Sequence, residues 1–442
     1  MSEEAVTLLQ QLIRNQCVND GTPESGHEHR SVETLREFFG VEGQVIEPVP
    51  GRQSVIYRVP GSDPDAPTLA LAPHMDVVPV DRDGWTQDPF AADIVDGFVY
   101  GRGAVDMLNV TATLAVAAKP YITGESRPRG DLLYIALADE EAGGRFGAHT
   151  LVNEHWDLVA ADYMLTEVAY PPVSYASETA IPVATGEKGA FWSGLRSTGT
   201  PGHGSAPYRS DNALRPMVEA VHGIFSEPMP VGITDEWRQF VSSLDLDDEL
   251  KEALVDPDRV DDALDSMAVD DPLFARYAHA VTHLTVSPNM LRGGMKANVI
   301  ADSARADIDV RSLPGMNREF VDSFLFKAMG NARDDIDIEP FMDMESTISP
   351  IGNPLWEAIA DSVEVLEGHR NLLPTTMTVG TDARFWRSKA GTIAYGVGLF
   401  DDRMHFSEML ALFHGHDERV TVESVHRTET LYVEILERFL GS

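Results

Sequence analysis

Cysteine is almost absent from this 442-residue chain, which contains only Cys17. A single cysteine excludes an internal disulfide and fits a reducing cytoplasm, where we predict that the protein resides. We interpret Cys17 as an ordinary helix residue and not as a catalytic thiol. Long apolar runs are also missing, because no stretch reaches the roughly 18 residues of a membrane-spanning helix. Residues 1–6 are acidic and lead into an amphipathic helical pattern, unlike a signal peptide.

Lysine is the second scarce residue type, with only six in the chain. Asp and Glu number 71 against 34 Lys and Arg, which gives a formal net charge of −37 at pH 7. A surface that negative repels nucleic acid and anionic membranes, and we expect neither as a partner. A metal site would use only a handful of these carboxylates. The excess fits either a surface adapted to high salt or a genome that prefers arginine codons.

Length and composition favour two folded domains. A chain of 442 residues exceeds the size at which one core usually stops growing, and 43% hydrophobic residues exclude extensive disorder. Helix and strand patterns alternate over residues 1–186, as expected for an α/β domain. The pattern then changes to alternating strands at 190–196, 303–311 and 336–341 and to helical spacing at 212–225 and 318–329.

Polar side chains follow three apolar runs that have the length of buried strands. They are His74 and Asp76 after residues 68–73, Asp139, Glu140 and Glu141 after residues 131–138, and Glu167 after residues 163–166. Alternate residues of an extended chain share one side, so His74 and Asp76 emerge together, as a metal ligand and the carboxylate that orients it do. Three adjacent carboxylates at a buried strand end require compensating cations or protons, although a solvated acidic turn is the alternative. An open α/β sheet places its ligand site at such strand ends.

Six motifs follow one another between about residue 70 and residue 420. They are Pro73-His74-Met75-Asp76-Val77-Val78-Pro79, Gly101-Arg102-Gly103-Ala104-Val105-Asp106-Met107, Asp139-Glu140-Glu141, Thr198-Gly199-Thr200-Pro201-Gly202-His203-Gly204-Ser205, Ala297-Asn298-Val299-Ile300 with Asp309-Val310-Arg311, and His414-Gly415-His416-Asp417-Glu418-Arg419-Val420. With these motifs the chain resembles the M20 family of metallopeptidases and amidohydrolases, which includes aminoacylases, glutamate carboxypeptidases, succinyl-diaminopimelate desuccinylases and dipeptidases.

The resemblance implies an α/β fold with two parts. One is a zinc-exopeptidase-like catalytic domain with a mixed, mostly parallel sheet, which we place at residues 1–186 and 344–442. The other is an inserted α+β, ferredoxin-like lid of four strands and two helices at residues 187–343, through which the protein would form a homodimer. An acidic helical insertion at about residues 234–280 interrupts the lid, and its role is not readable from the sequence.

The resemblance also implies a centre of two divalent metal ions per subunit. His74, Asp106 and Glu167 would bind one ion, and Asp106, Glu141 and His414 would bind the other. Two dications about 3.5–4 Å apart repel strongly without a shared anion, which Asp106 would supply. Mixed imidazole and carboxylate ligands favour zinc, with cobalt or manganese as alternatives. A cis peptide bond after Asp106 is a further implication.

Glu140 is the predicted general base. Adjacent residues at a strand end face opposite ways, so Glu141 can bind a metal ion while Glu140 takes the proton of the attacking water and passes it to the leaving nitrogen. Asp76 is predicted to support catalysis by orienting the His74 ring.

Three histidines lie close together near the C-terminus and compete for the remaining ligand position. His414 fits the family pattern because Glu418 follows it four residues later. His416 is the second choice, and neither His416 nor His405 has such a partner.

Four residues outside the metal centre are candidates for substrate contacts. In family members the counterparts of Asn298 and Arg311 meet a substrate carboxylate, which a planar guanidinium grips by two bonds. A surface salt bridge is the alternative for Arg311. In dimers His203 would reach the neighbouring active site and polarise the scissile carbonyl, although its glycine-bounded loop also fits an ordinary turn. Arg384 would supply a second cation for the substrate.

The sequence therefore predicts a two-metal hydrolase that cleaves an amide bond of a short peptide or an N-acyl amino acid with a free carboxylate. Exopeptidase and deacylase activities stay open, because both need the same ions, base and carboxylate clamp. The competing hypothesis is a noncatalytic family member that serves in binding or dimerisation, although every expected catalytic position is filled. A serine hydrolase is disfavoured, because the chain has no Gly-x-Ser-x-Gly elbow.

Overall fold

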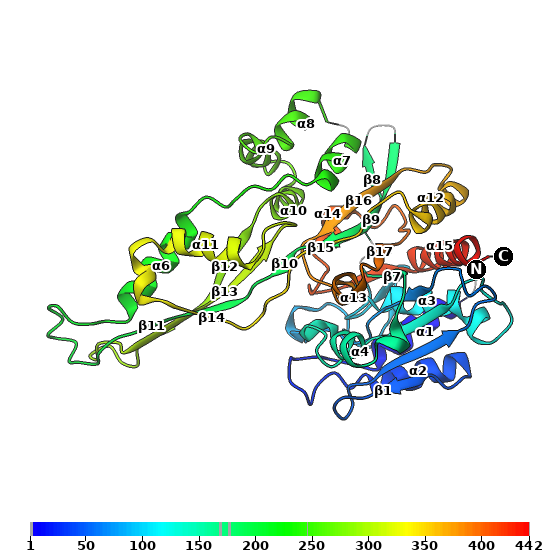
Figure 1. Cartoon of the computed structure of the whole chain (residues 1–442), viewed down its shortest axis with the longest axis horizontal. Helices are drawn as coiled ribbons and strands as arrows, with labels where there is room; N and C mark the ends of the chain where they lie inside the picture. Colours follow the sequence, from blue (N-terminus) through cyan, green and yellow to red (C-terminus); the bar gives the residue numbers. More distant parts are fainter. Residues whose placement is uncertain (1–2, 168–169, 176–177, 245, 442) are drawn as a thin grey trace.

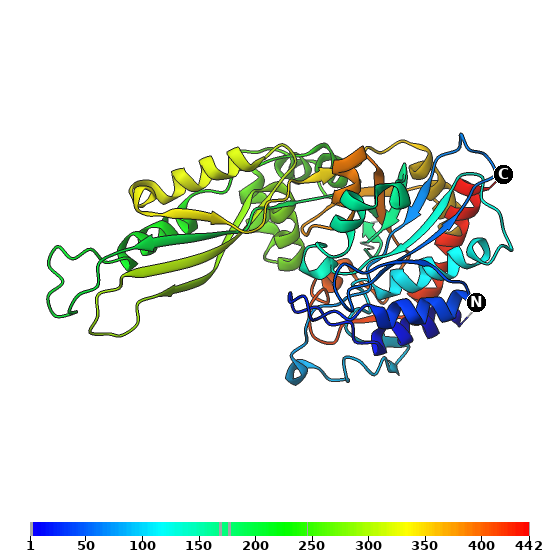
Figure 2. The same cartoon turned by 60° about the horizontal axis from the view of Figure 1, so that its bottom comes forward.

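The computed structural model describes residues 3–167, 170–175, 178–244 and 246–441. A large sheet with its helices forms the body, which comprises the described residues of 3–187 and 344–441 (Figure 1). A second sheet with two helices projects from the body as an arm, residues 189–226 and 284–340, and Figure 2 shows this arm from another side. Residues 234–282 form the helical insertion between them.

The body contains a ten-stranded mixed sheet. Its strands are β1 (Gln44–Ile46), β2 (Ser54–Val59), β3 (Leu69–Leu71), β6 (Leu132–Ala136), β7 (Tyr163–Thr166), β8 (Val173–Tyr175), β9 (Glu178–Glu187), β15 (Thr347–Ile348), β16 (Leu372–Met377) and β17 (Ile393–Val397). Their order is β1-β2-β6-β3-β7-β17-β9-β15, with β8 and β16 also paired to β9. The central strands β6, β3, β7 and β17 run parallel, so the loops that follow them leave at one edge. A small sheet of β4 (Ile94–Val95), β5 (Phe98–Tyr100) and β18 (Arg419–Thr421) lies beside them.

Helices cover both faces of the large sheet, as an α/β architecture requires. One face packs against α1 (Glu4–Arg14), α2 (His29–Phe39), α3 (Leu108–Ile122), α12 (Pro354–Glu367) and α15 (Val422–Leu440), and the other against α4 (Ala148–Glu154), α5 (Trp156–Val159) and α13 (Ala383–Ala390). Leu132 and Tyr134 of β6 join the first core, while Leu133 and Ile135 join the second. This alternation is that of a strand buried on both faces. Short elements η1 (Arg82–Gly84), η2 (Glu140–Ala142) and α14 (Phe406–Leu410) lie in the connecting loops.

Cys17 lies outside the first helix, so our interpretation of it as a helix residue was wrong. Helix α1 ends at Arg14, and Gln16 adopts a left-handed conformation with φ 50° that turns the chain away. The Cys17 thiol is buried, with Sγ 3.2 Å from the Ser31 hydroxyl. Burial raises its pKa to about 12, which makes it a poor nucleophile.

The arm is an antiparallel sheet with two helices on one face. It comprises β10 (Gly189–Ala190), β11 (Ser193–Thr198), β12 (Thr285–Gly293), β13 (Ser303–Ser312), β14 (Asp337–Pro340), α6 (Leu214–Ser226), α11 (Arg318–Met329) and η3 (Gly330–Asp335). Strand β10 continues the register of β11 along β13, so the arrangement amounts to four strands in the order β14-β11-β13-β12. Met217 of α6 and Phe324 of α11 share a core with Ile308 of β13. Strands β11, β13 and β14 and helices α6 and α11 lie close to where the sequence patterns predicted them, whereas no pattern indicated β12. The domain boundaries stay a prediction.

The helical insertion joins the arm to the body. Its helices are α7 (Asp235–Ser243), α8 (Asp248–Leu254), α9 (Val260–Met267) and α10 (Pro272–Thr282). Trp237 and Phe240 of α7 share a core with Leu373 and Met377 of β16 in the body. No helix in the described part of the chain has the length and apolar character needed to cross a membrane.

Candidate metal centre

The loops at the carboxyl edge of the parallel strands converge on one cavity, as predicted. His74 follows β3, Glu140 and Glu141 follow β6, and Glu167 follows β7. Asp106 and His414 reach the same place from the loops before α3 and β18. The cavity of about 160 Å³ is lined by carboxylates and His414 together with Trp192, Arg311 and Arg384.

Asp106 stands between the two predicted histidine ligands. Its Oδ1 lies 3.4 Å from His74 Nε2, and its Oδ2 lies 3.3 Å from His414 Nε2. Glu167 Oε2 is 3.6 Å from His74 Nε2, and Glu141 Oε2 is 3.1 Å from His414 Nε2. The structure thus brings all five predicted ligands together, with one oxygen of Asp106 directed to each histidine.

Two buried atoms of this group fit a bound cation. His74 Nε2 and Glu141 Oε1 have no hydrogen-bond partner among the described residues, although both are shielded from solvent. Buried polar atoms are almost always satisfied, so two unpartnered ligand atoms in one cluster fit a site for a cation. Imidazole and carboxylate ligands suit a catalytic divalent metal.

Electrostatics favour the same conclusion. Burial raises the pKa of Glu141 to about 7, and burial together with Glu167 raises the pKa of Glu140 well above its ordinary range. The Asp106 and Glu141 carboxylates raise the pKa of His414 to about 10. So many buried carboxylates retain protons unless cations compensate their charge. Divalent ions would supply that compensation and displace the protons.

The three consecutive carboxylates do not continue an extended strand, which corrects the prediction that they alternate in direction. Strand β6 ends at Ala136, Asp139 has a left-handed φ of 69°, and Glu140–Ala142 form the 3-10 turn η2. Asp139 turns away from the cavity, pairs with Arg52 and accepts a 2.8 Å hydrogen bond from the Phe146 amide. Glu140 and Glu141 still line the cavity together, because the turn directs both toward it.

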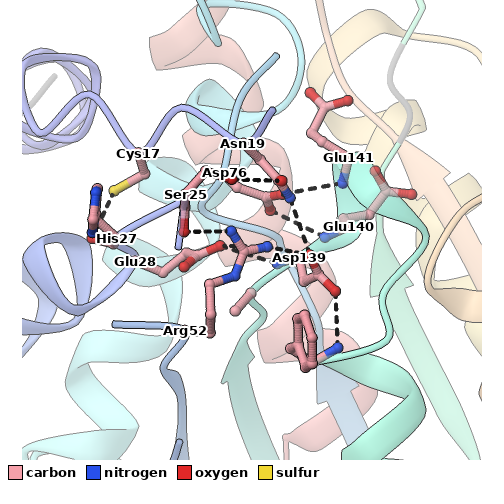
Figure 3. A network of polar contacts seen from close by, with 12 residues as sticks. Cys17, Asn19, Ser25, His27, Glu28, Arg52, Asp76, Asp139, Glu140 and Glu141 are labelled. Atoms are coloured by element: carbon pink, nitrogen blue, oxygen red, sulfur yellow. Dashed lines mark hydrogen bonds and ion pairs between the residues drawn. The ribbon is translucent and has the colours of Figure 1, made fainter. Parts of the chain in front are cut away.

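Asp76 organises this turn through its carboxylate (Figure 3). Its carboxylate accepts hydrogen bonds from the backbone amides of Glu140 and Glu141 at 3.2 and 3.1 Å and from Asn19 Nδ2 at 2.8 Å. His74 Nδ1 lies 3.0 Å from the main-chain oxygen of Asp76 and 3.7 Å from its carboxylate. Asp76 therefore orients His74 mainly through its carbonyl, while its side chain positions the two glutamates.

The spacing between His414 and Glu418 has a physical basis in the structure. Buried Glu418 accepts hydrogen bonds from Arg102 Nη1 at 2.7 Å and from the amides of Val105 and Asp106 at 2.8 and 3.0 Å. Arg102 in turn donates to the His414 carbonyl at 3.1 Å. Glu418 thus holds the Asp106 loop and the His414 loop against each other.

The alternatives to His414 lie elsewhere. The ring of His416 packs against Gly84, and His405 is an exposed residue that precedes α14. The peptide bond between Asp106 and Met107 is cis, as the resemblance implied.

Two of the four predicted substrate contacts line the cavity. Arg311 Nε donates to Asp309 Oδ1 at 2.8 Å, and its guanidinium lies 5.1 Å from the ring of Trp192, which donates to the same oxygen at 2.7 Å. The salt bridge proposed as the alternative therefore exists, and it fixes Arg311 beside the metal ligands. Buried Arg384 donates to the carbonyls of Thr381 and Gly143 at 2.7 and 3.0 Å.

Comparison with known proteins agrees with this geometry. The model of peptidase family M20/M25/M40 matches residues 70–438. The chain belongs to this family. It is 26% identical to aminoacylase-1 of Sus scrofa, over 98% of this chain and 94% of that protein, and 26% identical to succinyl-diaminopimelate desuccinylase 2 of Ruegeria sp. (strain TM1040), over 99% and 96%.

Solved M20 structures share the fold. An M20 metallo-carboxypeptidase of Sulfolobus solfataricus superposes with a TM-score of 0.75 at 18% identity, covering 99% of both chains. A dinuclear metal-binding M20 peptidase of Bacillus subtilis gives 0.58 at 13% identity, covering 98% of both. The protein is thus an M20 hydrolase that cleaves amide bonds with the help of metal. These comparisons give no support to a noncatalytic alternative.

His203 and Asn298 of this M20 hydrolase lie away from the cavity, at the free end of the arm. Strand register places Thr198 opposite Ser303 at the tip and Ala190 opposite Arg311 at the root. The loops beyond Thr198 and before Ser303 form the tip in Figures 1 and 2. The Gly204 amide donates to the Asn298 carbonyl at 2.8 Å. Because ten strand residues span roughly 30 Å, Asn298 and Arg311 do not meet within one chain.

Asp382 is a cavity neighbour that sequence reasoning missed. It is buried, and neither carboxylate oxygen has a hydrogen-bond partner among the described residues. Burial raises its pKa well above the ordinary range, with Arg384 opposing and Glu167 reinforcing the shift. In the sequence Asp382 looks like a helix cap, and it does precede α13, but its side chain caps nothing. Its place beside the cavity becomes visible only in the structure, which shows that the junction between β16 and α13 is buried.

Proposed function

We propose that the centre binds two divalent ions, preferably zinc, at the ligand sets His74–Asp106–Glu167 and Asp106–Glu141–His414. The observation that carries this proposal is the position of Asp106, with one carboxylate oxygen facing each histidine. When bound, the ions would acidify a water molecule and polarise the scissile carbonyl. Their number and identity remain part of the proposal.

Glu140 is the proposed general base. Its carboxylate lines the cavity, and its backbone is fixed by Asp76. The raised pKa suits a group that accepts a proton from water and returns it to the leaving nitrogen. A ligand atom of Glu140 also lies within 4.8 Å of those of His74 and Glu167, so metal content must distinguish a base from a ligand.

The substrate class follows from the cations of the cavity. Arg311 and Arg384 line the same cavity as the metal ligands, so they could bind an anionic group of the substrate while its amide bond lies over the centre. Asp309 and Trp192 hold Arg311 in position, which reduces the entropy lost on binding. We therefore propose a short peptide or an N-acyl amino acid with a free carboxylate. Relatives named aminoacylase and desuccinylase favour the acyl amino acid.

We further propose a homodimer in which His203 and Asn298 serve the partner subunit's active site. Both lie at the tip of the arm and are not among the residues that line the catalytic cavity, so we infer that a role in catalysis requires a second molecule. The catalytic domain would then comprise residues 1–186 and 344–442, and the lid and dimerisation domain would comprise residues 187–343. A cytoplasmic location stays a prediction.

Metal analysis combined with a substrate panel tests the proposed function. Purified protein should contain about two catalytic ions per chain that are lost in Asp106→Asn, because a neutral amide is a poor bridge. The panel should contain dipeptides and N-acetyl, N-succinyl and N-carbamoyl amino acids, each also with its carboxylate amidated. Hydrolysis of amidated and free substrates at equal rates would contradict the proposed clamp.

A further inference from the structure

A second group of histidines and a carboxylate lies in the helical insertion, outside the catalytic cavity. Asp261 belongs to α9, His279 to α10, and His283 follows the end of α10. One ligand atom from each lies within 4.8 Å of the others. The two histidines are four residues apart, and their rings are stacked in parallel with centroids 4.0 Å apart. Residues at this spacing share one face of a helix, so both rings face α9 together.

The hydrogen bonds of His283 determine which ring nitrogen is free. Its Nδ1 lies 3.1 Å from the His279 carbonyl and 2.9 Å from the Thr282 hydroxyl. That hydroxyl donates its own hydrogen to the Ala278 carbonyl at 2.7 Å, so Nδ1 must carry the hydrogen. A neutral ring then has its lone pair on Nε2. A backbone carbonyl at one nitrogen is the arrangement that fixes the tautomer of metal-binding histidines.

Nε2 of His283 faces a carboxylate without a hydrogen bond. It lies 3.1 Å from Asp261 Oδ1, yet the approach lacks hydrogen-bond geometry and the atom has no partner among the described residues. Only 1% of His283 is exposed. Two hydrogen-bond acceptors at so short a distance repel each other unless a cation lies between them.

We propose that Asp261, His279 and His283 bind a divalent metal ion in addition to the catalytic ions. Two imidazole nitrogens and one carboxylate oxygen are ligands that suit zinc, with solvent or a further carboxylate in the fourth position. Because the stacked rings hold their lone pairs in parallel planes, the His279 ring would turn about its Cβ–Cγ bond to meet an ion held by His283 and Asp261. Asp265 lies four residues after Asp261 on the same face of α9 and is a candidate for that position.

A metal ion at this site would stabilise the junction between the body and the arm. Lys188 lies in the link between β9 and β10, and its Nζ donates to the carbonyls of Ala280 and His283 at 2.5 and 2.7 Å. An ion on His279 and His283 would therefore fix the same turn that holds this link, and it would tie α9 to it. We expect a structural effect, because Asp261, His279 and His283 do not line the catalytic cavity.

Zinc counting tests the site without relying on catalysis. Metal is removed from the protein with a chelator, and the protein is then dialysed against zinc. The zinc bound per chain is measured by inductively coupled plasma mass spectrometry. Asp261→Asn and His279→Gln should each hold one zinc fewer per chain than the control Asp262→Asn, which removes the same charge from the neighbouring position. Zinc should also raise the melting temperature of the control more than that of the two variants. These positions are preferred over buried His283, whose replacement endangers folding.

The same measurement in a His74→Ala, Asp106→Asn background separates this site from the catalytic centre. One zinc should remain there and disappear on adding Asp261→Asn. If the proposed catalytic ions are absent, the difference of one zinc between Asp261→Asn and Asp262→Asn persists in the otherwise native chain. Equal zinc contents of Asp261→Asn, His279→Gln and Asp262→Asn would overturn the proposal and leave an ordinary histidine–carboxylate contact.

Discussion

The root and the tip of the arm carry candidate substrate residues in opposite environments. At the root, Arg311 is held by Asp309 and Trp192 and lines the cavity of its own chain. At the tip, His203 and Asn298 are exposed, and the Nδ1 of His203 accepts a hydrogen bond from the amide of the neighbouring Ser205. The root is therefore preorganised within one molecule, whereas the tip lacks a site to act on.

This difference shows what a single chain can complete. A side chain whose partners are buried beside a cavity is positioned by folding alone. A side chain that projects from a loop is positioned only when another surface meets it, at the cost of ordering that loop. Breaking the centre at the root should thus affect each subunit separately, while breaking the tip should affect its partner.

The largest effect is expected at the metal centre itself. Glu140→Gln should lower kcat by roughly 10²- to 10⁴-fold, because the base is lost, while the metal content stays unchanged. Asp106→Asn should lose both metal and activity. Activity assays and metal analysis of the same preparations distinguish the two. A loss of metal in Glu140→Gln would make Glu140 a ligand and not the base.

Arg311 should give the next largest effect, at the root. Arg311→Met should lower kcat/KM by about 2–4 kcal/mol of transition-state binding, as expected when one partner of a buried charged pair is removed. Amidation of the substrate carboxylate should weaken the native enzyme similarly and scarcely affect the variant. The same sensitivity to amidation in both enzymes would remove Arg311 from the site.

The sequence predicted the metal centre more fully than it predicted its surroundings. His74 and Glu167 could be found because apolar strands end directly before them, and Asp106 and His414 because their motifs resemble the family's. The direction of Asp139 could not be found, because a single left-handed residue redirected the chain. The rule that alternate residues of a strand point to the same side does not apply beyond such a turn.

The contacts between distant segments were out of reach for a different reason. The buried state of Asp382 and the grouping of Asp261 with His279 and His283 depend on how α13 and α9 pack, which local patterns do not specify. The resemblance implied that Asn298 and Arg311 meet one substrate carboxylate, but an extended strand separates them within one chain. The helical insertion was recognised as helical, and only the structure shows that it packs against the body.

Lys188 provides a smaller test of how well the root is shielded from solvent. Burial, together with the nearby Arg311, lowers its pKa from 10.5 to about 7. Below pH 7 the amine is charged in both the folded and the unfolded state. The free energy of unfolding is then reduced by the full cost of burying the charge. Above pH 7 the unfolded state holds more protons, and the free energy of unfolding rises until about pH 10.5.

Urea unfolding at pH 7 and pH 9 measures this rise. We expect the native chain to gain about 2 kcal/mol relative to Lys188→Met, which has no proton to release. Parallel pH dependences of the two chains would show that solvent reaches the root.

The smallest effect, a partial recovery of activity, tests whether the tip works on a partner. His203→Ala and Glu140→Gln homodimers should each be nearly inactive. In a mixed dimer one site receives both defects and the other receives neither, because the tip and the base of a site come from different subunits. Random exchange makes half of the dimers mixed, so about a quarter of native activity should return. A mixture that stays inactive after verified subunit exchange would confine His203 to its own chain or to no chemistry.

Two matched mixtures sharpen the comparison of root and tip. Asn298→Ala mixed with Glu140→Gln should recover activity like the His203 variant, because Asn298 lies at the same tip. Arg311→Met mixed with Glu140→Gln should recover none beyond the residual activity of Arg311→Met, because both defects lie at the root and every site then retains one of them. If the Arg311 mixture recovers a quarter of the activity as well, Arg311 too would serve the partner, and the distinction between root and tip would be wrong.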